Sequence, residues 1–321
     1  MYFDVAQIDV AIWVPPLVSF FISVMTTSGG ISGAFLLLPF QMSVLGFTSP
    51  ALSSTNQLYN IVAIPGGVYR YIREGRMVWP LTWIVIAGTL PGVLAGAFIR
   101  IEILPDPVKF KFFAGLVLLY IGIRLLVDLL SKKKAGDKKT AEARFYELVK
   151  NFKAKQSKGS VGGMKYLPRI SVKTFNVKKL VYEFYGESFE VPTTWVFLLS
   201  LLVGIVGGAY GIGGGAILAP VFVAFFRLPI YTVAGATLMG TLITSVAGVA
   251  FYQALAPFYP SMSVAPDWLL GILFGVGGLA GTYFGAKLQK YLPASFIKWL
   301  LCLSIGFLSV KYILDFVIKI I

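Results

Sequence analysis

Long apolar runs separated by charged or Pro/Gly-rich stretches dominate the pattern of hydrophobic and polar positions. A helix needs about 20 residues to cross the hydrocarbon core of a bilayer. The last three runs of each half reach that length, whereas the first two are shorter, at about 15 to 18 residues. The runs of the first half cover 10–27, 31–46, 50–70, 78–99 and 108–130, and those of the second cover 192–209, 212–226, 231–252, 267–286 and 296–318.

The two short runs of each half flank a glycine-rich break. The first break is Ser28-Gly29-Gly30-Ile31-Ser32-Gly33, and the second is Gly211-Ile212-Gly213-Gly214-Gly215. Such a pair can form a re-entrant hairpin, a broken helix or two thin spans. A hairpin adds no crossing and two spans add two, so each half crosses the membrane an odd number of times under either arrangement. An odd unit that is repeated must insert upside down relative to its partner.

The charges of the loops test this topology independently. The loop with Arg70, Arg73 and Arg76 is predicted to be cytoplasmic, because Lys and Arg concentrate on that side. Its counterpart in the second half, 253–266, has no Lys or Arg, whereas the following loop is basic. We therefore predict an all-α integral membrane protein with two inverted repeats and both termini outside. Each repeat contains a glycine-broken short helical pair plus three transmembrane helices, about 8–10 membrane segments in all.

Composition supports this fold class and excludes several functions. Of 321 residues, 57% are hydrophobic and 13% are charged, whereas soluble domains carry about 25% charged residues. Mean hydropathy is +0.80. One cysteine, Cys302, excludes an internal disulfide, and the lack of histidine excludes imidazole metal ligation. The chain has no G-x-x-x-x-G-K-[ST] phosphate loop. We expect no cofactor and a location in the cytoplasmic (inner) membrane.

A basic insert divides the two repeats, which gives expected domains at 1–130, 131–190 and 191–321. The insert holds 15 Lys or Arg and 6 Asp or Glu, a net charge of +9 out of +14. Phe145, Leu148, Val149 and Phe152 predict one apolar face of an amphipathic helix, and 170–191 favours a short hairpin.

Two roles for the insert compete. A basic amphipathic helix can lie on the anionic inner leaflet, where each Lys or Arg adds about 1 kcal/mol. A regulatory or nucleic-acid role would use the same charge. Because no zinc spacing and no nucleic-acid motif occurs, we favour the lipid surface and expect no nucleic-acid partner.

Uncharged polar residues cluster at and after the glycine breaks, whereas Asp128, Asp267 and Lys287 lie near run ends. Paired interrupted segments in inverted halves indicate a transporter's midplane site. Glycines, hydroxyls and amides without acidic groups suit an oxyanion. The alternative for any single Ser or Thr is helix packing or a bond to its own helix. The candidate substrate-binding residues are Gly30, Ser32, Gly33, Thr55, Asn56, Gln57, Gly211, Gly213, Gly214, Thr237 and Thr241.

Several short motifs resemble the TauE/SafE family of sulfite and organosulfonate exporters. They are the second break with Pro220, the stretch 70–76 (Arg-Tyr-Ile-Arg-Glu-Gly-Arg), the pair Gly92/Gly96, and Leu104-Pro105. The resemblance covers about 10–130 and 192–318, and it implies a secondary carrier for sulfite or a related sulfur oxyanion. The first break departs from the second, with Ser32 and Ala34 in place of Gly213 and Gly215. The long basic insert lies outside the resemblance.

Other function classes remain as alternatives at this stage. An anion channel on the same scaffold would use the same polar cluster. A scaffold or signalling protein would act through the basic insert. A membrane enzyme would have a thin acid–base repertoire, with no histidine and one cysteine. The sequence does not assign the substrate, the direction of transport, the coupling ion or the oligomeric state.

Overall fold

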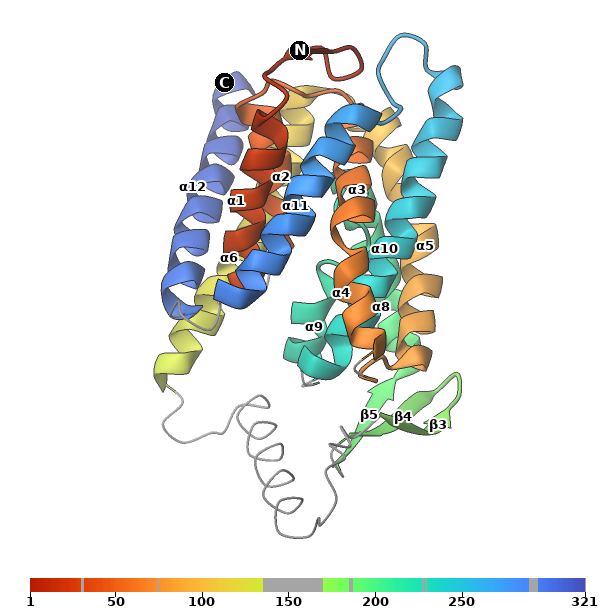
Figure 1. The fold of residues 1–321 in the computed structure, drawn as a ribbon. Helices are drawn as coiled ribbons and strands as arrows, with labels where there is room; N and C mark the ends of the chain where they lie inside the picture. Colours follow the sequence, from red (N-terminus) through yellow and green to blue (C-terminus); the bar gives the residue numbers. More distant parts are fainter. Residues whose placement is uncertain are drawn as a thin grey trace.

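Helices dominate the computed structural model, which describes residues 1–29, 32–73, 75–134, 170–184, 187–226, 228, 230–288 and 294–320 (Figure 1). The first half contains α1 (Val14–Gly29), α2 (Ala34–Ser43), α3 (Ala51–Ala63), α4 (Pro65–Arg73), α5 (Trp79–Glu102) and α6 (Pro107–Lys134). The second contains α8 (Thr193–Tyr210), α9 (Leu218–Phe225), α10 (Ile230–Leu255), the 3-10 helix η1 (Ala256–Phe258), α11 (Trp268–Leu288) and α12 (Ala294–Ile320). The strands are β1 (Tyr2–Phe3), β2 (Ile8–Asp9), β3 (Ser171–Phe175), β4 (Lys179–Phe184) and β5 (Glu187–Pro192).

Six helices in the described part of the chain are long and apolar enough to cross a membrane: α5, α6, α8, α10, α11 and α12. This confirms the helical membrane fold class. The run 50–70, which we expected to cross as one helix, is instead split into α3 and α4 at Ile64. Pro65 explains the split, because proline lacks the backbone N–H of the helical ladder and its ring clashes with the preceding turn.

The pairs α1–α2 and α8–α9 are hairpins that enter from opposite ends of the molecule. Both ends of the first hairpin lie beside the loop before α11: the Ala6 amide donates to the Asp267 carboxylate (3.4 Å), and the Ala51 amide donates to the Ser263 carbonyl (2.9 Å). The second hairpin starts and ends at the end of the molecule that carries the β3–β5 sheet, where Phe222 packs in one cluster with Tyr182. Figure 1 shows both termini at one end and the β3–β5 sheet at the other.

Helices of one half pack mainly on helices of the other, and the partners are exchanged. The first helix of each half packs on the helix formed by the fourth apolar run of the other half. Thus α1 packs on α11, and α8 packs on α5. Likewise α3 packs on α11 and α10 on α5, while α6 pairs with α12. Glycines permit this close approach: a Cβ on Gly92 would lie 2.9 Å from the Cα of Gly204. Such an exchange is expected for repeats related by a two-fold axis. Their opposite orientation in a membrane, and the domain limits, stay predictions.

The described part of the insert forms a docked sheet. Its antiparallel order is β3-β4-β5, so the expected hairpin over 170–191 has a third strand, an exception to the all-α expectation. Tyr182 and Leu180 are buried against the ends of α5, α9 and α10. The Tyr182 hydroxyl lies 2.8 Å from the hydroxyl of Thr232. The sheet therefore contacts both α9, the second helix of the second hairpin, and the start of α10. The predicted amphipathic helix with Phe145, Leu148, Val149 and Phe152 lies outside the described residues.

Basic side chains gather at the sheet end of the molecule. Arg70 and Arg73 lie in the last turn of α4, and α4 ends at the end of the molecule that carries the sheet, opposite to both termini (Figure 1). Which end faces the cytoplasm stays a prediction.

Candidate functional site at the glycine breaks

The second break ends α8 with two glycines in left-handed backbone conformations. Gly211 has φ 85° and Gly213 has φ 73°. The amides of Gly211 and Ile212 both donate to the Gly207 carbonyl, at 2.9 and 3.0 Å, which closes the last turn of the helix. A Cβ on Gly211 would lie 2.5 Å from the Ser53 carbonyl oxygen. Both the conformation and the space therefore require glycine at position 211.

Amide side chains of α3 bind the carbonyls that the second break leaves outside the helical ladder. The Asn60 amide nitrogen lies 2.9 Å from the Ile212 carbonyl. The amide nitrogen of Asn56 lies 3.1 Å from the Gly211 carbonyl and 3.2 Å from the Ala34 carbonyl, which follows the first break. Asn56 and Asn60 are both fully buried. One side chain, Asn56, thus joins the second break to the residue that directly follows the first.

A second hydrogen bond joins the hairpins at their tips. The Tyr210 hydroxyl, on the last residue of α8, donates to the Phe35 carbonyl in the first turn of α2 (3.0 Å). The Gln41 amide nitrogen lies 3.4 Å from the side-chain oxygen of Asn56 and so supports the same junction from α2. The second break therefore meets the start of α2, directly after the first break, inside the protein.

Hydroxyl residues of α10 line the other side of the second break. The Gly214 amide donates to the Thr244 hydroxyl (3.1 Å), and a Cβ on Gly213 would lie 2.9 Å from the methyl group of Thr241. The hydroxyl of Thr241 donates to the Thr237 carbonyl one turn back (2.9 Å), and Thr237 donates to Ala234 (3.1 Å). These two threonines therefore lie at the break, but their protons bond their own helix.

The structure brings most of the sequence-predicted residues together and separates one. Gly211, Gly213 and Gly214 form the second break, and Asn56, Gln57, Thr237 and Thr241 lie around it. At the first break, the Ser32 hydroxyl accepts a bond from the Ala34 amide (3.4 Å), and a Cβ on Gly33 would lie 2.9 Å from the Ser23 hydroxyl. Gly30 lies outside the described residues.

Thr55 has a different position. Its hydroxyl accepts a hydrogen bond from the Asp267 amide (2.9 Å), next to the first residue of α11. The helical period explains this, because Thr55 and its neighbour Asn56 point about 100° apart around α3. Thr55 therefore supports the loop before α11 instead of the breaks.

Several buried residues at the breaks were not among the candidates: Asn60, Tyr210 and Thr244, described above, and four more. Ser53 donates to the Ala209 carbonyl (2.9 Å), Tyr59 bonds Ser23 (2.8 Å), and Thr89 packs against Gly214. The fourth, Gln41, contacts Asn56. A sequence signal existed for Gln41, which is the only amide in the apolar run 31–46. The other three are small or aromatic residues of the kind that any membrane helix carries.

The chemistry at the junction is neutral and rich in hydrogen-bonding groups. Three buried amide oxygens, those of Gln41, Gln57 and Asn60, have no hydrogen-bond partner. An amide can present either its oxygen or its NH₂ group by rotating about its last bond. The described side chains that contact the breaks carry no charge, so an anion would meet donors here without repulsion from a carboxylate.

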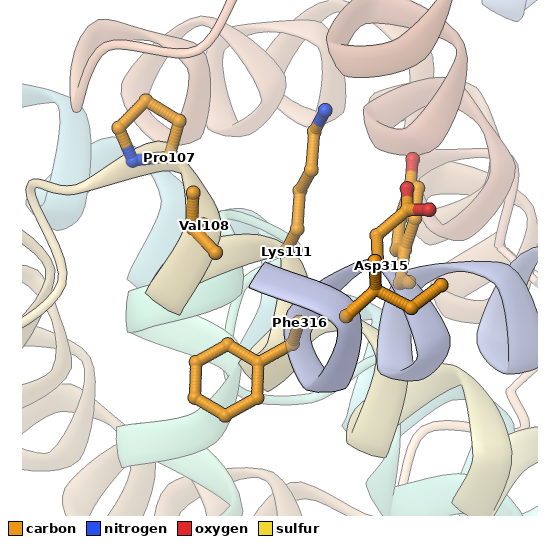
Figure 2. A pocket seen from close by; sticks show the side chains of 7 residues that line it. Pro107, Val108, Lys111, Asp315 and Phe316 are labelled. Atoms are coloured by element: carbon orange, nitrogen blue, oxygen red, sulfur yellow. The ribbon is translucent and has the colours of Figure 1, made fainter. Parts of the chain in front are cut away.

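A separate cavity of about 340 Å³ lies between the start of α6 and the end of α12 (Figure 2). It carries one cation, Lys111, and one carboxylate, Asp315. Tyr312 connects it with the first hairpin through hydrogen bonds to Ser43 (2.5 Å) and the Pro39 carbonyl (3.4 Å). Its lining residues are Pro107, Val108, Lys111, Tyr312, Asp315, Phe316 and Ile318.

Comparison with known proteins places the chain in a family. One relative, described as a probable membrane transporter protein from Bacillus subtilis, is 29% identical over 105 residues. That match covers 33% of this chain, and this chain covers 40% of the relative. No solved structure matches. The family model described as sulfite exporter TauE/SafE matches residues 16–312, both hairpins included, and the chain therefore belongs to the TauE/SafE family.

Proposed function

We propose that the protein is a secondary carrier for a small anion, namely sulfite or a related sulfur oxyanion. The observation that carries the proposal is the junction made by Asn56, which holds the Gly211 carbonyl of the second break and the Ala34 carbonyl directly after the first. Membership of the TauE/SafE family supports the class of substrate, because its description names sulfite export. Paired broken helices at a repeat interface are the usual place for the substrate of such carriers.

The junction suggests how a substrate is held. The NH₂ groups of Asn56 and Asn60 now donate to backbone carbonyls of the second break. An oxyanion is a stronger acceptor than a carbonyl, because hydrogen bonds to a charged group are about twice as strong as neutral ones. A sulfur oxyanion can therefore displace Gly211 and Ile212 from these donors. The displaced break is then free to move.

The two hairpins suggest how access alternates. Because they enter from opposite ends, movement of α1–α2 opens the junction toward the end with the termini, and movement of α8–α9 opens it toward the sheet end. The hydrogen bonds of Asn56 and Tyr210 close the path between these movements. A carrier of this kind needs no nucleotide and no bound cofactor.

Flux measurements in proteoliposomes test the proposal. We expect uptake of radiolabelled sulfite that saturates with concentration and is competed by thiosulfate or sulfoacetate, with or without a proton gradient as driving force. A channel on the same scaffold would instead give electrogenic flux that does not saturate. Absence of uptake for every sulfur oxyanion, in both gradient conditions, would overturn the proposed substrate class.

We further propose that the protein resides in the cytoplasmic membrane and that its insert contacts anionic lipid. The described strands of the insert already lie at the end where α4 presents Arg70 and Arg73. A lipid-binding insert predicts that deletion of 135–169 weakens binding to vesicles containing phosphatidylserine. Unchanged binding would favour a partner protein as the ligand of the insert.

A further inference from the structure

Arg100 is a fully buried cation in the last turn of α5. Its guanidinium donates to the Thr48 carbonyl (2.9 Å) and to the Leu104 carbonyl, and it lies 3.7 Å from the ring centre of Phe110. Its Nε has no hydrogen-bond partner. The whole guanidinium is therefore removed from water while one of its donors stays unused.

The partners of Arg100 do not neutralise its charge. Both acceptors are backbone carbonyls, and within the described ranges no carboxylate forms a salt bridge with it. The nearby Glu102 instead accepts a hydrogen bond from the Tyr259 hydroxyl. Burying a charge is unfavourable unless the charge is paired, and a neutral side chain can hold two carbonyls without that cost. The guanidinium is thus better explained as a site for an anion than as a clamp alone.

Arg100 lies between one end of the molecule and the second break. Thr48 belongs to the linker from α2 to α3, and Leu104 to the linker from α5 to α6. On the inner side, Ala97 and Ile101 of α5 pack in one cluster with Tyr252. The Tyr252 hydroxyl lies 3.4 Å from the Gly208 carbonyl, one turn before the second break. A chain of packing contacts therefore connects the helix turn that carries Arg100 with the end of α8 at the second break.

The geometry points to Arg100 as a second binding position for the transported oxyanion, at the end of the molecule that carries the termini. A planar guanidinium binds an oxyanion with two parallel hydrogen bonds. Such an anion takes the place of the Thr48 and Leu104 carbonyls and releases the linker that follows the first hairpin. The inference rests on the proposed function for the identity of the anion, whereas the charge at Arg100 can be tested without transport.

Labelling of a cysteine at position 48 with charged reagents tests whether Arg100 attracts anions. Cys302→Ser removes the only thiol, and Thr48→Cys keeps the backbone carbonyl that Arg100 binds. The purified protein in lipid nanodiscs is labelled with an anionic and with a cationic methanethiosulfonate. We expect the ratio of anionic to cationic rates to fall about tenfold in Arg100→Gln and to stay within about threefold in Arg100→Lys, because a buried charge concentrates counter-ions near it. Ile12→Cys, on the exposed N-terminal segment, is the matched control.

Sulfate provides a second measurement on the protein with Arg100 intact. We expect sulfate to slow anionic labelling at Thr48→Cys but not at Ile12→Cys, and to have no such effect in Arg100→Gln. An unchanged rate ratio in folded Arg100→Gln, or absence of protection by sulfate with Arg100 intact, would overturn the inference. Neither result depends on sulfite flux, so failure of the proposed function is seen separately in the transport assay.

Discussion

The Tyr210 hydroxyl donates a hydrogen bond to the Phe35 carbonyl over 3.0 Å, and this bond joins the tips of two hairpins that enter from opposite ends. The rings of the two residues also pack, with centroids 6.3 Å apart. Tyr210 is the last residue of the long helix α8, and Phe35 is in the first turn of α2. Separation of the hairpins must therefore break a buried hydrogen bond and an aromatic contact.

Removing the Tyr210 hydroxyl tests the strength of this junction. We expect Tyr210→Phe to lower the free energy of unfolding by about 1 kcal/mol, because the buried Phe35 carbonyl loses its donor while the ring contact remains. Reversible unfolding in mixed micelles measures the difference. Tyr120→Phe, at an exposed tyrosine of α6, is expected to change stability by less than about 0.5 kcal/mol. Equal effects for the two variants would contradict a role of Tyr210 in the junction.

Alanine substitution separates the two requirements at Gly211. Gly46 also has a positive φ, at 76°, but a Cβ there has nothing within 4 Å, so Gly46→Ala should cost only about 1 kcal/mol. Gly211→Ala adds a clash with the Ser53 backbone and should cost at least about 2 kcal/mol more. Gly306→Ala, in open space within α12, should be neutral or stabilising. The order of unfolding midpoints checks all three, and a milder effect at Gly211 than at Gly46 would refute the close approach.

The exchange of helix partners predicts matched defects in the two halves. Gly92→Ala would push α5 from α8, and Gly281→Ala would push α11 from α1, where a Cβ lies 2.8 Å from Ser23 Cβ. Each should destabilise the protein by about 1 to 3 kcal/mol, the usual range for overpacking. Gly122→Ala, whose nearest neighbour would be 3.5 Å away, is the control. If only one of the two interface variants were affected, the equivalence of the interfaces would fail.

The sheet supplies a prediction about pH. Burial raises the pKa of the Tyr182 phenol well above its usual value, although its hydrogen bond to Thr232 opposes the shift. A raised folded-state pKa means that this contribution to stability is present below about pH 10 and is lost as the pH rises above that, because the unfolded phenol ionises first. Unfolding midpoints between about pH 8 and pH 11 should therefore fall less steeply in Tyr182→Phe than in the wild type. Parallel curves would contradict the buried, neutral phenol.

The sequence predicts the architecture better than it predicts individual contacts. Run length and glycine content locate both broken pairs within a few residues. Bilayer thickness sets the length of an apolar run that can span it, and a break in a helix favours glycine. Pro65 is itself a sequence signal for the split between α3 and α4, but the uninterrupted apolar run 50–70 favours a single helix. Thr55 and Asn56 show the limit at the site: adjacent polar residues look equivalent in a sequence, and the rotation of α3 decides that only Asn56 reaches the breaks.

Pairings between distant segments have no signal in a single sequence. Arg100 looks like an ordinary loop charge, and its burial depends on the α2–α3 linker with Thr48 and on Phe110 of α6, which both contact its guanidinium. The contact of Tyr182 with Thr232 likewise depends on where the insert returns to the bundle. Both are properties of the tertiary packing, which the local pattern does not encode.

Sulfite uptake by Asn56→Ala is the most direct test of a carrier whose path runs through the joined breaks. Gln253→Ala, which removes an amide from an exposed position near the end of α10, is the control at equal reconstitution. We expect Asn56→Ala to reduce initial uptake at least about tenfold, the loss typical of a charge-assisted hydrogen bond to substrate, and Gln253→Ala to stay near the wild type. Full sulfite uptake by folded Asn56→Ala would contradict the proposed path.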